Sequence, residues 1–180
     1  RYADDFVLGF QFRSDAERFL RDLRGRLEEF GLQLHPEKTR LLEFGRFADQ
    51  NQRRRGEGKP ETFDFLGFTH CCGKTRNGRF VVIRRSIGKR LRAKLRDIKT
   101  KLTDMMHRPV AEQGLWLQQV VRGWFYYHAV PLNSDALETF RAQVIRLWRH
   151  VLQRRSQKGR RKWTWRRMKG LVQRWIPPKR

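Results

Sequence analysis

Two adjacent carboxylates near the start of the chain, Asp4 and Asp5, are the residues best suited to catalysis. They follow Tyr2 and Ala3 and precede an apolar run, which is typical of a tight turn between two short strands. Carboxylates at such a turn can bind Mg²⁺, and two ions roughly 3.5–4 Å apart stabilise the attacking and leaving oxygens of a phosphoryl transfer. Asp-Asp is also an ordinary turn dipeptide, so the pair alone leaves both interpretations open.

The charge of the chain is extreme and unevenly distributed. The 180 residues carry a formal net charge of +24. Residues 1–64 hold equal numbers of basic and acidic side chains, residues 65–138 hold 14 basic and 5 acidic, and residues 139–180 hold 15 basic and none acidic. Such a surface attracts polyanions, and nucleic acid is the partner that it favours. We therefore expect a near-neutral first part followed by a nucleic-acid-binding remainder.

The remaining potential metal ligands form no recognisable pattern. Cys71 and Cys72 are adjacent, no Cys-x-x-Cys pair is present, and the five histidines are scattered. No apolar stretch approaches the roughly 20 residues of a membrane span, and we expect no signal peptide. We predict a cytoplasmic protein with no membrane segment. Because the chain opens at Arg1 inside a predicted strand, we interpret it as part of a longer protein.

The first half of the chain is predicted to mix strands and one helix. Residues 1–12 suggest a hairpin around the Asp pair. A helix is expected from Ser14, where Glu17 would complete a capping box, to a stop at Gly31. Residues 32–44 are predicted to be extended around a turn, residues 45–62 to be a loop, and residues 63–85 to be a second hairpin. The arginine run 53–55 fits either a solvated patch or a phosphate contact.

The second half is predicted to be helical. An apolar stripe runs from Ile87 to Met105 with basic residues opposite, and Pro109 ends the pattern. A second helix is expected over residues 110–127, and a third would be capped by Asp135 with Glu138. We predict an α+β fold in three parts: a strand-and-helix part (1–85), a helical bundle (86–155) and a basic tail (156–180).

Tryptophans alternate with basic residues in the predicted tail. Trp163, Trp165 and Trp175 lie among arginines and lysines, and no acidic residue follows Glu138. Cationic side chains neutralise phosphates and aromatic rings stack on unpaired bases, so we favour nucleic-acid contact here. The alternative is that the tryptophans pack together as a small core.

Four segments together resemble a reverse transcriptase, and specifically the group II intron-encoded class. Tyr2-Ala3-Asp4-Asp5 resembles the catalytic hairpin motif of the palm domain. Residues 31–39 resemble the Gly-Leu-x-Leu-x-x-Glu-Lys-Thr block that follows the palm helix, and residues 63–68 resemble the Phe-Leu-Gly-Phe hairpin that grips the primer. Residues 122–127 resemble the Arg-Gly-Trp-x-x-Tyr-Tyr signature of the thumb, or maturase-specific domain.

The resemblance implies roles for individual residues. Asp4 matches the principal catalytic, metal-binding aspartate, and Asp5 matches its neighbour. Tyr2, Ala3 and Lys38 match positions near the nucleotide and template, although Lys38 could equally form a salt bridge with Glu37 or Asp64. Leu66, Gly67 and Phe68 match the primer grip. Trp124 and Tyr127 are expected to build the bundle core. Together with the charge pattern, the resemblance implies RNA-binding residues at Lys89, Arg90, Arg92, Lys94, Arg96, Arg122, Arg160, Arg161, Lys162, Arg166 and Arg167.

The implied function is RNA-directed DNA polymerase with intron maturase activity, with Mg²⁺ as cofactor. The reaction joins a primer 3′-hydroxyl to the α-phosphate of a dNTP and releases pyrophosphate. The expected partners are group II intron RNA, an RNA template/DNA primer duplex and dNTP. Two alternatives remain: a non-enzymatic intron RNA-binding maturase module, or a generic basic nucleic-acid-binding protein.

The family's other palm aspartate and its fingers would precede Arg1. Because two neighbouring carboxylates leave a metal pair under-coordinated, we expect the 180-residue chain by itself not to polymerise.

Overall fold

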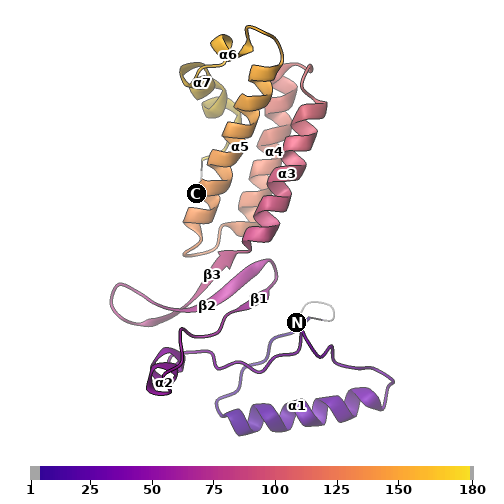
Figure 1. The fold of residues 1–180 in the computed structure, drawn as a ribbon, viewed down its shortest axis with the longest axis vertical. Coiled ribbons are helices and arrows are strands. Elements are labelled where there is room, and N and C mark those ends of the chain that lie inside the picture. Colours follow the sequence, from indigo (N-terminus) through magenta and orange to yellow (C-terminus); the bar gives the residue numbers. More distant parts are fainter. Residues whose placement is uncertain (1–4, 179–180) are drawn as a thin grey trace.

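The computed structural model describes residues 5–178, which form the α+β fold expected from the sequence (Figure 1). A three-stranded sheet lies between an N-terminal part that carries two helices and a helical part that carries five. The elements are α1 (Arg13–Glu28), α2 (Ala48–Arg54), β1 (Phe63–Phe65), β2 (Phe68–Lys74), β3 (Phe80–Ser86), α3 (Gly88–Asp104), α4 (Val110–His128), α5 (Ser134–Arg154), α6 (Gly159–Lys162) and α7 (Trp165–Trp175).

The sheet is an antiparallel meander in the order β1-β2-β3. Phe65 pairs with Phe68 across the first turn, and Lys74 pairs with Phe80 across the second. The predicted hairpin over residues 63–85 is therefore present, but it has an additional short strand and turn at its start. That first turn consists of only two residues, Leu66 and Gly67.

Helices α3, α4 and α5 form a bundle around one hydrophobic core. The apolar stripe predicted for α3 is confirmed, because Ile98 and Leu102 are fully buried, and Pro109 lies just before α4 as expected. Trp148 of α5 is also fully buried. The core residues that these helices share with the C-terminal segment are Ile98, Leu102, Leu117, Val121, Phe125, Leu137, Phe140, Val144, Trp148, Val151, Leu152, Trp163, Met168 and Ile176.

One fully buried polar side chain, that of Gln113, joins the three helices of the bundle. Its amide nitrogen Nε2 donates to the carbonyl oxygens of Met105 (2.8 Å) and Met106 (3.2 Å) at the end of α3. Its oxygen Oε1 accepts a hydrogen bond of 2.9 Å from the indole of Trp148. Met105 and Met106 directly follow the last residue of α3, so Gln113 ties the end of that helix to α4 through their carbonyls.

The C-terminal segment packs on the bundle. Helix α6 contacts α5, and α7 contacts α4. Trp163 and Met168 are buried in the shared core. Gly114 permits the close approach of α7, because a Cβ atom at Gly114 would lie 2.6 Å from the ring of Trp175. Two of the three tail tryptophans, Trp163 and Trp175, therefore pack against the core of the bundle, instead of forming a separate small core with Trp165.

Helix α1 has the expected length, but its predicted start signal is wrong. The residue before it is Phe12, which makes no capping hydrogen bond, and Glu17 pairs with Arg13 at 2.7 Å. The predicted stop is confirmed: Gly31 has φ +65°, and its N–H and that of Leu32 bond back to Glu28 and Leu27. Ala16 is the one buried residue of α1.

The predicted loop over residues 45–62 contains the seven-residue helix α2. The carboxylate of Glu43 accepts hydrogen bonds from Asn51 (2.6 Å) and Arg55, which tie the helix to the preceding segment. These two bonds, the one from Asn51 first, hold the pKa of Glu43 below its usual range.

The start of α5 also differs from expectation. Asp135 does not cap it; the residue before the helix is Asn133, whose side chain bonds elsewhere. Among residues 5–178, none of the helices has both the length and the apolar character that a membrane span requires.

Candidate nucleic-acid interface

The Asp motif lies at the edge of the described chain. Tyr2, Ala3 and Asp4 fall outside residues 5–178. Asp5 is exposed and forms an isolated β-bridge, whereas the residues that follow it, 6–10, form no strand, so the predicted hairpin is not continued as a strand there. The side chains of Phe6, Val7 and Leu8 are between 42% and 51% exposed, which leaves this segment without the apolar packing that pairs short strands.

No group of three His, Cys, Asp or Glu side chains within residues 5–178 is arranged to hold a metal ion. Mg²⁺ requires several oxygen ligands in near-octahedral geometry. The described residues alone therefore do not form the metal site that the resemblance implies.

Lys38 is exposed in the turn at residues 36–38. It forms no ion pair with any residue between 5 and 178, so neither of the salt bridges considered from the sequence is present there. Asp64 instead accepts a hydrogen bond of 2.5 Å from the hydroxyl of Thr69. The structure leaves the ammonium group of Lys38 open to solvent.

The Phe-Leu-Gly-Phe segment forms the tight turn between β1 and β2. Leu66 and Gly67 have φ of +47° and +79°, the positive values that a two-residue hairpin turn of the primed type needs at both central positions. Glycine adopts this conformation readily, whereas leucine does so at a cost. A strained leucine in a turn implies that surrounding contacts hold it in place.

Those contacts come from the helical bundle. The phenol of Tyr127 in α4 donates a hydrogen bond of 2.8 Å to the carbonyl oxygen of Leu66. Its ring stacks on Phe68 with ring centres 5.7 Å apart. The backbone N–H of Ile87, just before α3, donates to the carbonyl of Gly67 at 3.1 Å. The turn that resembles the primer grip is thus attached to the helix that carries the thumb-like signature.

Arg90 lies beside the same turn. A Cβ atom at Gly67 would be 3.2 Å from a guanidinium nitrogen of Arg90 and 3.3 Å from the ring of Tyr127. Any larger residue at position 67 would therefore need both a positive φ and a displaced neighbour. Arg90, predicted only as an RNA contact, also packs at the junction of sheet and bundle.

His128 completes the junction on its buried side. Its ring stacks on Trp124 at 3.7 Å and lies 5.3 Å from the ring of Phe68. Nδ1 lies 3.2 Å from the carbonyl oxygen of Trp124. Burial lowers the pKa of His128 below its ordinary value, and the nearby charge of Arg90 lowers it further. A neutral imidazole at this position suits the apolar stack.

Asn133 is a junction residue that sequence reasoning missed. Its amide nitrogen donates to the hydroxyl of Ser86 and to the carbonyl of His128, both at 2.8 Å. Its oxygen accepts a 3.0 Å hydrogen bond from the backbone N–H of Ser86. One buried side chain thereby links the end of β3 to the end of α4. Its position before Ser134 resembled an ordinary helix start, so the sequence carried no signal for this role.

The thumb-like signature divides between the two sides of α4. Trp124 is half-buried and stacks on Phe140 of α5, so its expected role in the bundle core is confirmed. Tyr127 is 51% exposed and reaches the sheet, so it was wrongly expected in the core. Arg122 and Gly123 are exposed, and Tyr126 is 78% exposed. The outward side therefore offers a cation and an aromatic ring to a partner.

The basic side of α3 is open to solvent and lacks acidic partners. Lys89, Arg90, Arg92 and Arg96 are exposed, whereas Lys94 is half-buried. None of them forms an ion pair with a residue of the described chain. Eight ion pairs lie within residues 13–74, whereas beyond Lys74 the described residues form one between themselves, Arg108–Glu112. Within residues 5–178, the basic side chains of α3 are thus not paired with acidic groups.

The C-terminal helices present a second basic surface. Trp165 is 52% exposed, and the guanidinium of Arg149 lies 4.5 Å from its ring centre. This cation on an aromatic face is the type of pair that stacks on bases and contacts phosphates. The basic residues predicted here are all exposed: Arg160, Arg161, Lys162, Arg166 and Arg167.

Residues 1–70 match the reverse transcriptase (RNA-dependent DNA polymerase) family. The matched segment contains the Asp motif, the Glu-Lys-Thr block and the Phe-Leu-Gly-Phe turn, and it ends within β2. No curated protein and no solved structure matches the chain.

The reverse transcriptase match stops short of the bundle. Tyr127, Asn133 and the basic side of α3 lie outside it. Tyr127 nevertheless donates a hydrogen bond to Leu66 of the matched segment, and Asn133 bonds to Ser86, which pairs with Phe68 of that segment. The match supports nucleic-acid template, primer and dNTP as partners of this family in general.

Proposed function

We propose that the chain is the palm end and thumb of a group II intron reverse transcriptase that also acts as a maturase. The observation that carries this proposal is the hydrogen bond between Tyr127 and Leu66, since it joins the segment that matches the reverse transcriptase family to the helix with the intron-type signature. A thumb must hold the template–primer duplex at a fixed position relative to the primer grip. A direct bond between the two elements serves that purpose.

In the proposed reaction, Asp4 and Asp5 hold Mg²⁺, the proposed cofactor, which would neutralise charge on the reacting phosphates. The turn at Leu66, Gly67 and Phe68 positions the primer end, and Lys38 lies near the nucleotide or template. Positioning and charge neutralisation together supply the catalysis.

RNA binding in this proposal belongs to the helical part. The basic sides of α3 and α7, with Arg122 and Tyr126 on α4, contact group II intron RNA through its phosphates and its shape. The absence of internal ion pairs on α3 supports this role, because charges left unpaired by the described protein are available to an external polyanion.

The test is cDNA synthesis on a primed RNA template by an active reverse transcriptase that carries this sequence. Asp4→Ala is expected to abolish incorporation of labelled dNTP and to leave RNA affinity within about twofold. Equal losses of synthesis and of RNA affinity would contradict the metal-site assignment. The 180-residue chain tested by itself is expected to be inactive, and incorporation that Asp4→Ala removes would overturn that expectation.

A second candidate is a maturase module that binds intron RNA without polymerising. The exposed basic helices favour it equally, because they serve RNA binding in either case. The assay of cDNA synthesis distinguishes the two candidate functions. RNA binding with no synthesis by the complete protein would support the second candidate.

A further inference from the structure

We propose that the surface around α2 binds the sugar-phosphate backbone of an unpaired nucleic-acid strand, as a contact separate from the helical bundle. This inference rests on the proposed function only in that the protein handles nucleic acid. The surface lies in the segment 45–62, which the sequence predicted to be a loop.

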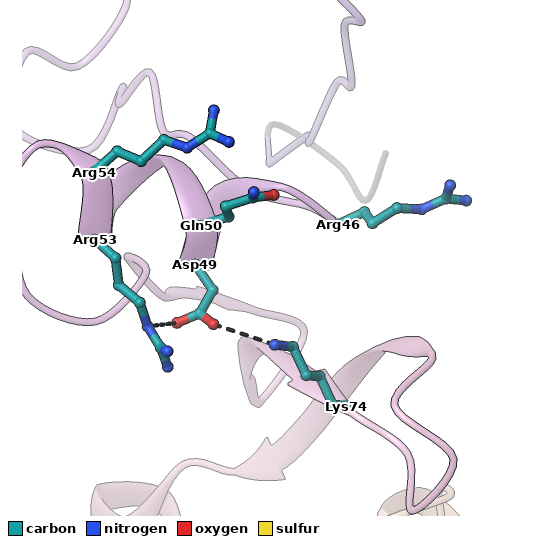
Figure 2. Close-up of a pocket in the computed structure, with 6 residues that line it drawn as sticks. All are labelled: Arg46, Asp49, Gln50, Arg53, Arg54 and Lys74. Carbon is teal, nitrogen blue, oxygen red and sulfur yellow. Dashed lines mark hydrogen bonds and ion pairs between the residues drawn. The ribbon is translucent and has the colours of Figure 1, made fainter.

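The surface is a shallow hollow of about 440 Å³ between α2 and the end of β2. Four of the six side chains that line it are cationic and one is acidic (Figure 2). The lining residues are Arg46, Asp49, Gln50, Arg53, Arg54 and Lys74.

Asp49 organises two of the four cations. One carboxylate oxygen lies 3.3 Å from Nε of Arg53, and the other lies 3.4 Å from Nζ of Lys74. Figure 2 shows the side chains of Arg53, from α2, and Lys74, from β2, both turned toward Asp49. Because Asp49 and Arg53 are in α2 and Lys74 is in β2, the carboxylate connects the helix to the sheet and keeps both charges at the surface.

The other two cations have no acidic partner among the described residues. Arg46 and Arg54 are exposed, form no ion pair with a residue of the described range, and extend away from Asp49 in Figure 2. Their neighbour Arg55 differs, because it pairs with Glu43 and with Glu57. Within the arginine run 53–55, therefore, only Arg54 is open to a partner.

The shape and the neighbouring ring indicate the class of ligand. Arg46 and Arg54 extend in different directions from the pair formed by Arg53 and Lys74 (Figure 2), so the four cations do not converge on one point, which suits a chain of phosphates better than a single small anion. Phe47 is 60% exposed, and the guanidinium of Arg46 lies 5.8 Å from its ring centre. A cationic track beside an open aromatic face is the arrangement that binds unpaired strands.

The place of α2 in the fold makes this contact distinct. Helix α2 lies on the same side of the sheet as α1, whereas α3 to α7 lie on the opposite side (Figure 1). A strand bound at α2 therefore extends the nucleic-acid surface past the sheet. We expect α2 to contribute to affinity independently of the bundle.

The experiment measures binding of a labelled 20-nucleotide single-stranded RNA by the full chain at several salt concentrations. The double variant Arg46→Glu/Arg54→Glu is compared with Arg21→Glu/Arg24→Glu on α1, which makes the same change in net charge at two exposed residues with no ion pair in the described chain. Loss of two phosphate contacts is expected to reduce the slope of log K against log salt by about 1.4 for the α2 variant. Equal effects of the two variants would overturn the proposal.

A substitution that makes the surface more positive provides a second test of the proposal. Asp49→Asn removes the acidic group and releases Arg53 and Lys74, and its exposed ion pairs contribute only about 0–1 kcal/mol to stability. We expect this variant to bind the RNA more tightly and with a steeper salt dependence. Unchanged or weaker binding would count against the α2 surface.

Two controls separate the remaining explanations. Arg92→Glu/Arg96→Glu on α3 tests the proposed function: if it weakens binding and the α2 variant does not, the inference fails while the function stands. If neither variant weakens binding, the inference and the proposed function both fail.

Inorganic tripolyphosphate tests for a nucleotide site. If the α2 variant loses tripolyphosphate binding but retains RNA affinity, the ligand is a free phosphate chain and the inference is wrong.

Discussion

The phenol of Tyr127 and the carbonyl oxygen of Leu66, 61 positions apart in the chain, lie 2.8 Å apart and form a hydrogen bond. The bond connects the sheet to the bundle at a turn whose leucine has a positive φ of 47°. Since backbone strain persists only where surrounding contacts hold it, Tyr127 is expected to fix the conformation of this turn.

Tyr127→Phe tests that relationship, because it deletes the hydroxyl and keeps the ring that stacks on Phe68. We expect a loss of about 0.5–1.5 kcal/mol in the free energy of unfolding, and faster hydrogen exchange at the turn amides. The matched control is Tyr126→Phe on the next, 78% exposed residue, which should change neither quantity. Identical behaviour of the two variants would show that the bond does not hold the turn.

Gln113 is expected to be essential to the bundle despite its polarity. Gln113→Met fills the space but leaves the indole N–H of Trp148 without its partner in the interior and removes the hydrogen bond to the carbonyl of Met106. Each unsatisfied buried group costs about 1–3 kcal/mol, so we expect a loss of about 2–4 kcal/mol in urea denaturation. A neutral effect would mean that water replaces the side chain.

Two glycines of α4 should respond to alanine in opposite directions. Gly114→Ala forces Trp175 away and should detach α7, measured as lost protection of α7 amides and a lower midpoint of thermal unfolding. Gly123→Ala meets no atom within 4 Å and gains helix propensity, so it should stabilise the chain by about 1 kcal/mol. Stabilisation by both would show that α7 is not packed as described.

The stability of the junction should depend on pH through His128. Burial lowers its pKa in the folded state, so below the unfolded value of about 6.5 the unfolded chain binds the proton more readily. The contribution of His128 is therefore complete above that pH and is lost as pH falls toward the folded pKa. His128→Gln should flatten the pH dependence of unfolding below about pH 6.5, and an unchanged slope would contradict the assignment.

The sequence predicted the helices of the bundle well because their apolar residues recur at helical spacing and Pro109 separates two of them. It missed α2, whose residues 48–54 are almost all polar and carry no such period. The capping signals at Ser14 and Asp135 failed, because side chains there found other partners or none. Such choices depend on neighbours that only the folded chain supplies.

The candidate site was only partly predictable for the same reason. Motif resemblance identified the turn at Leu66 and the signature at residues 122–127 separately, and their contact is a tertiary fact. Asn133 carried no motif and was missed. Charge composition predicted the basic surfaces. It could not predict that Arg53 pairs with Asp49 and Arg55 with Glu43, while Arg54 between them stays open to solvent, because these contacts depend on the folded chain.

The most direct test of the account is RNA binding by this chain, as a function of salt, to a folded group II intron and to an unrelated structured RNA of equal length. The proposed maturase role predicts at least tenfold preference for the intron at about 0.15 M salt, a difference of about 1.4 kcal/mol. Equal affinities that fall together as salt rises would contradict it, because the basic surfaces would then attract any polyanion.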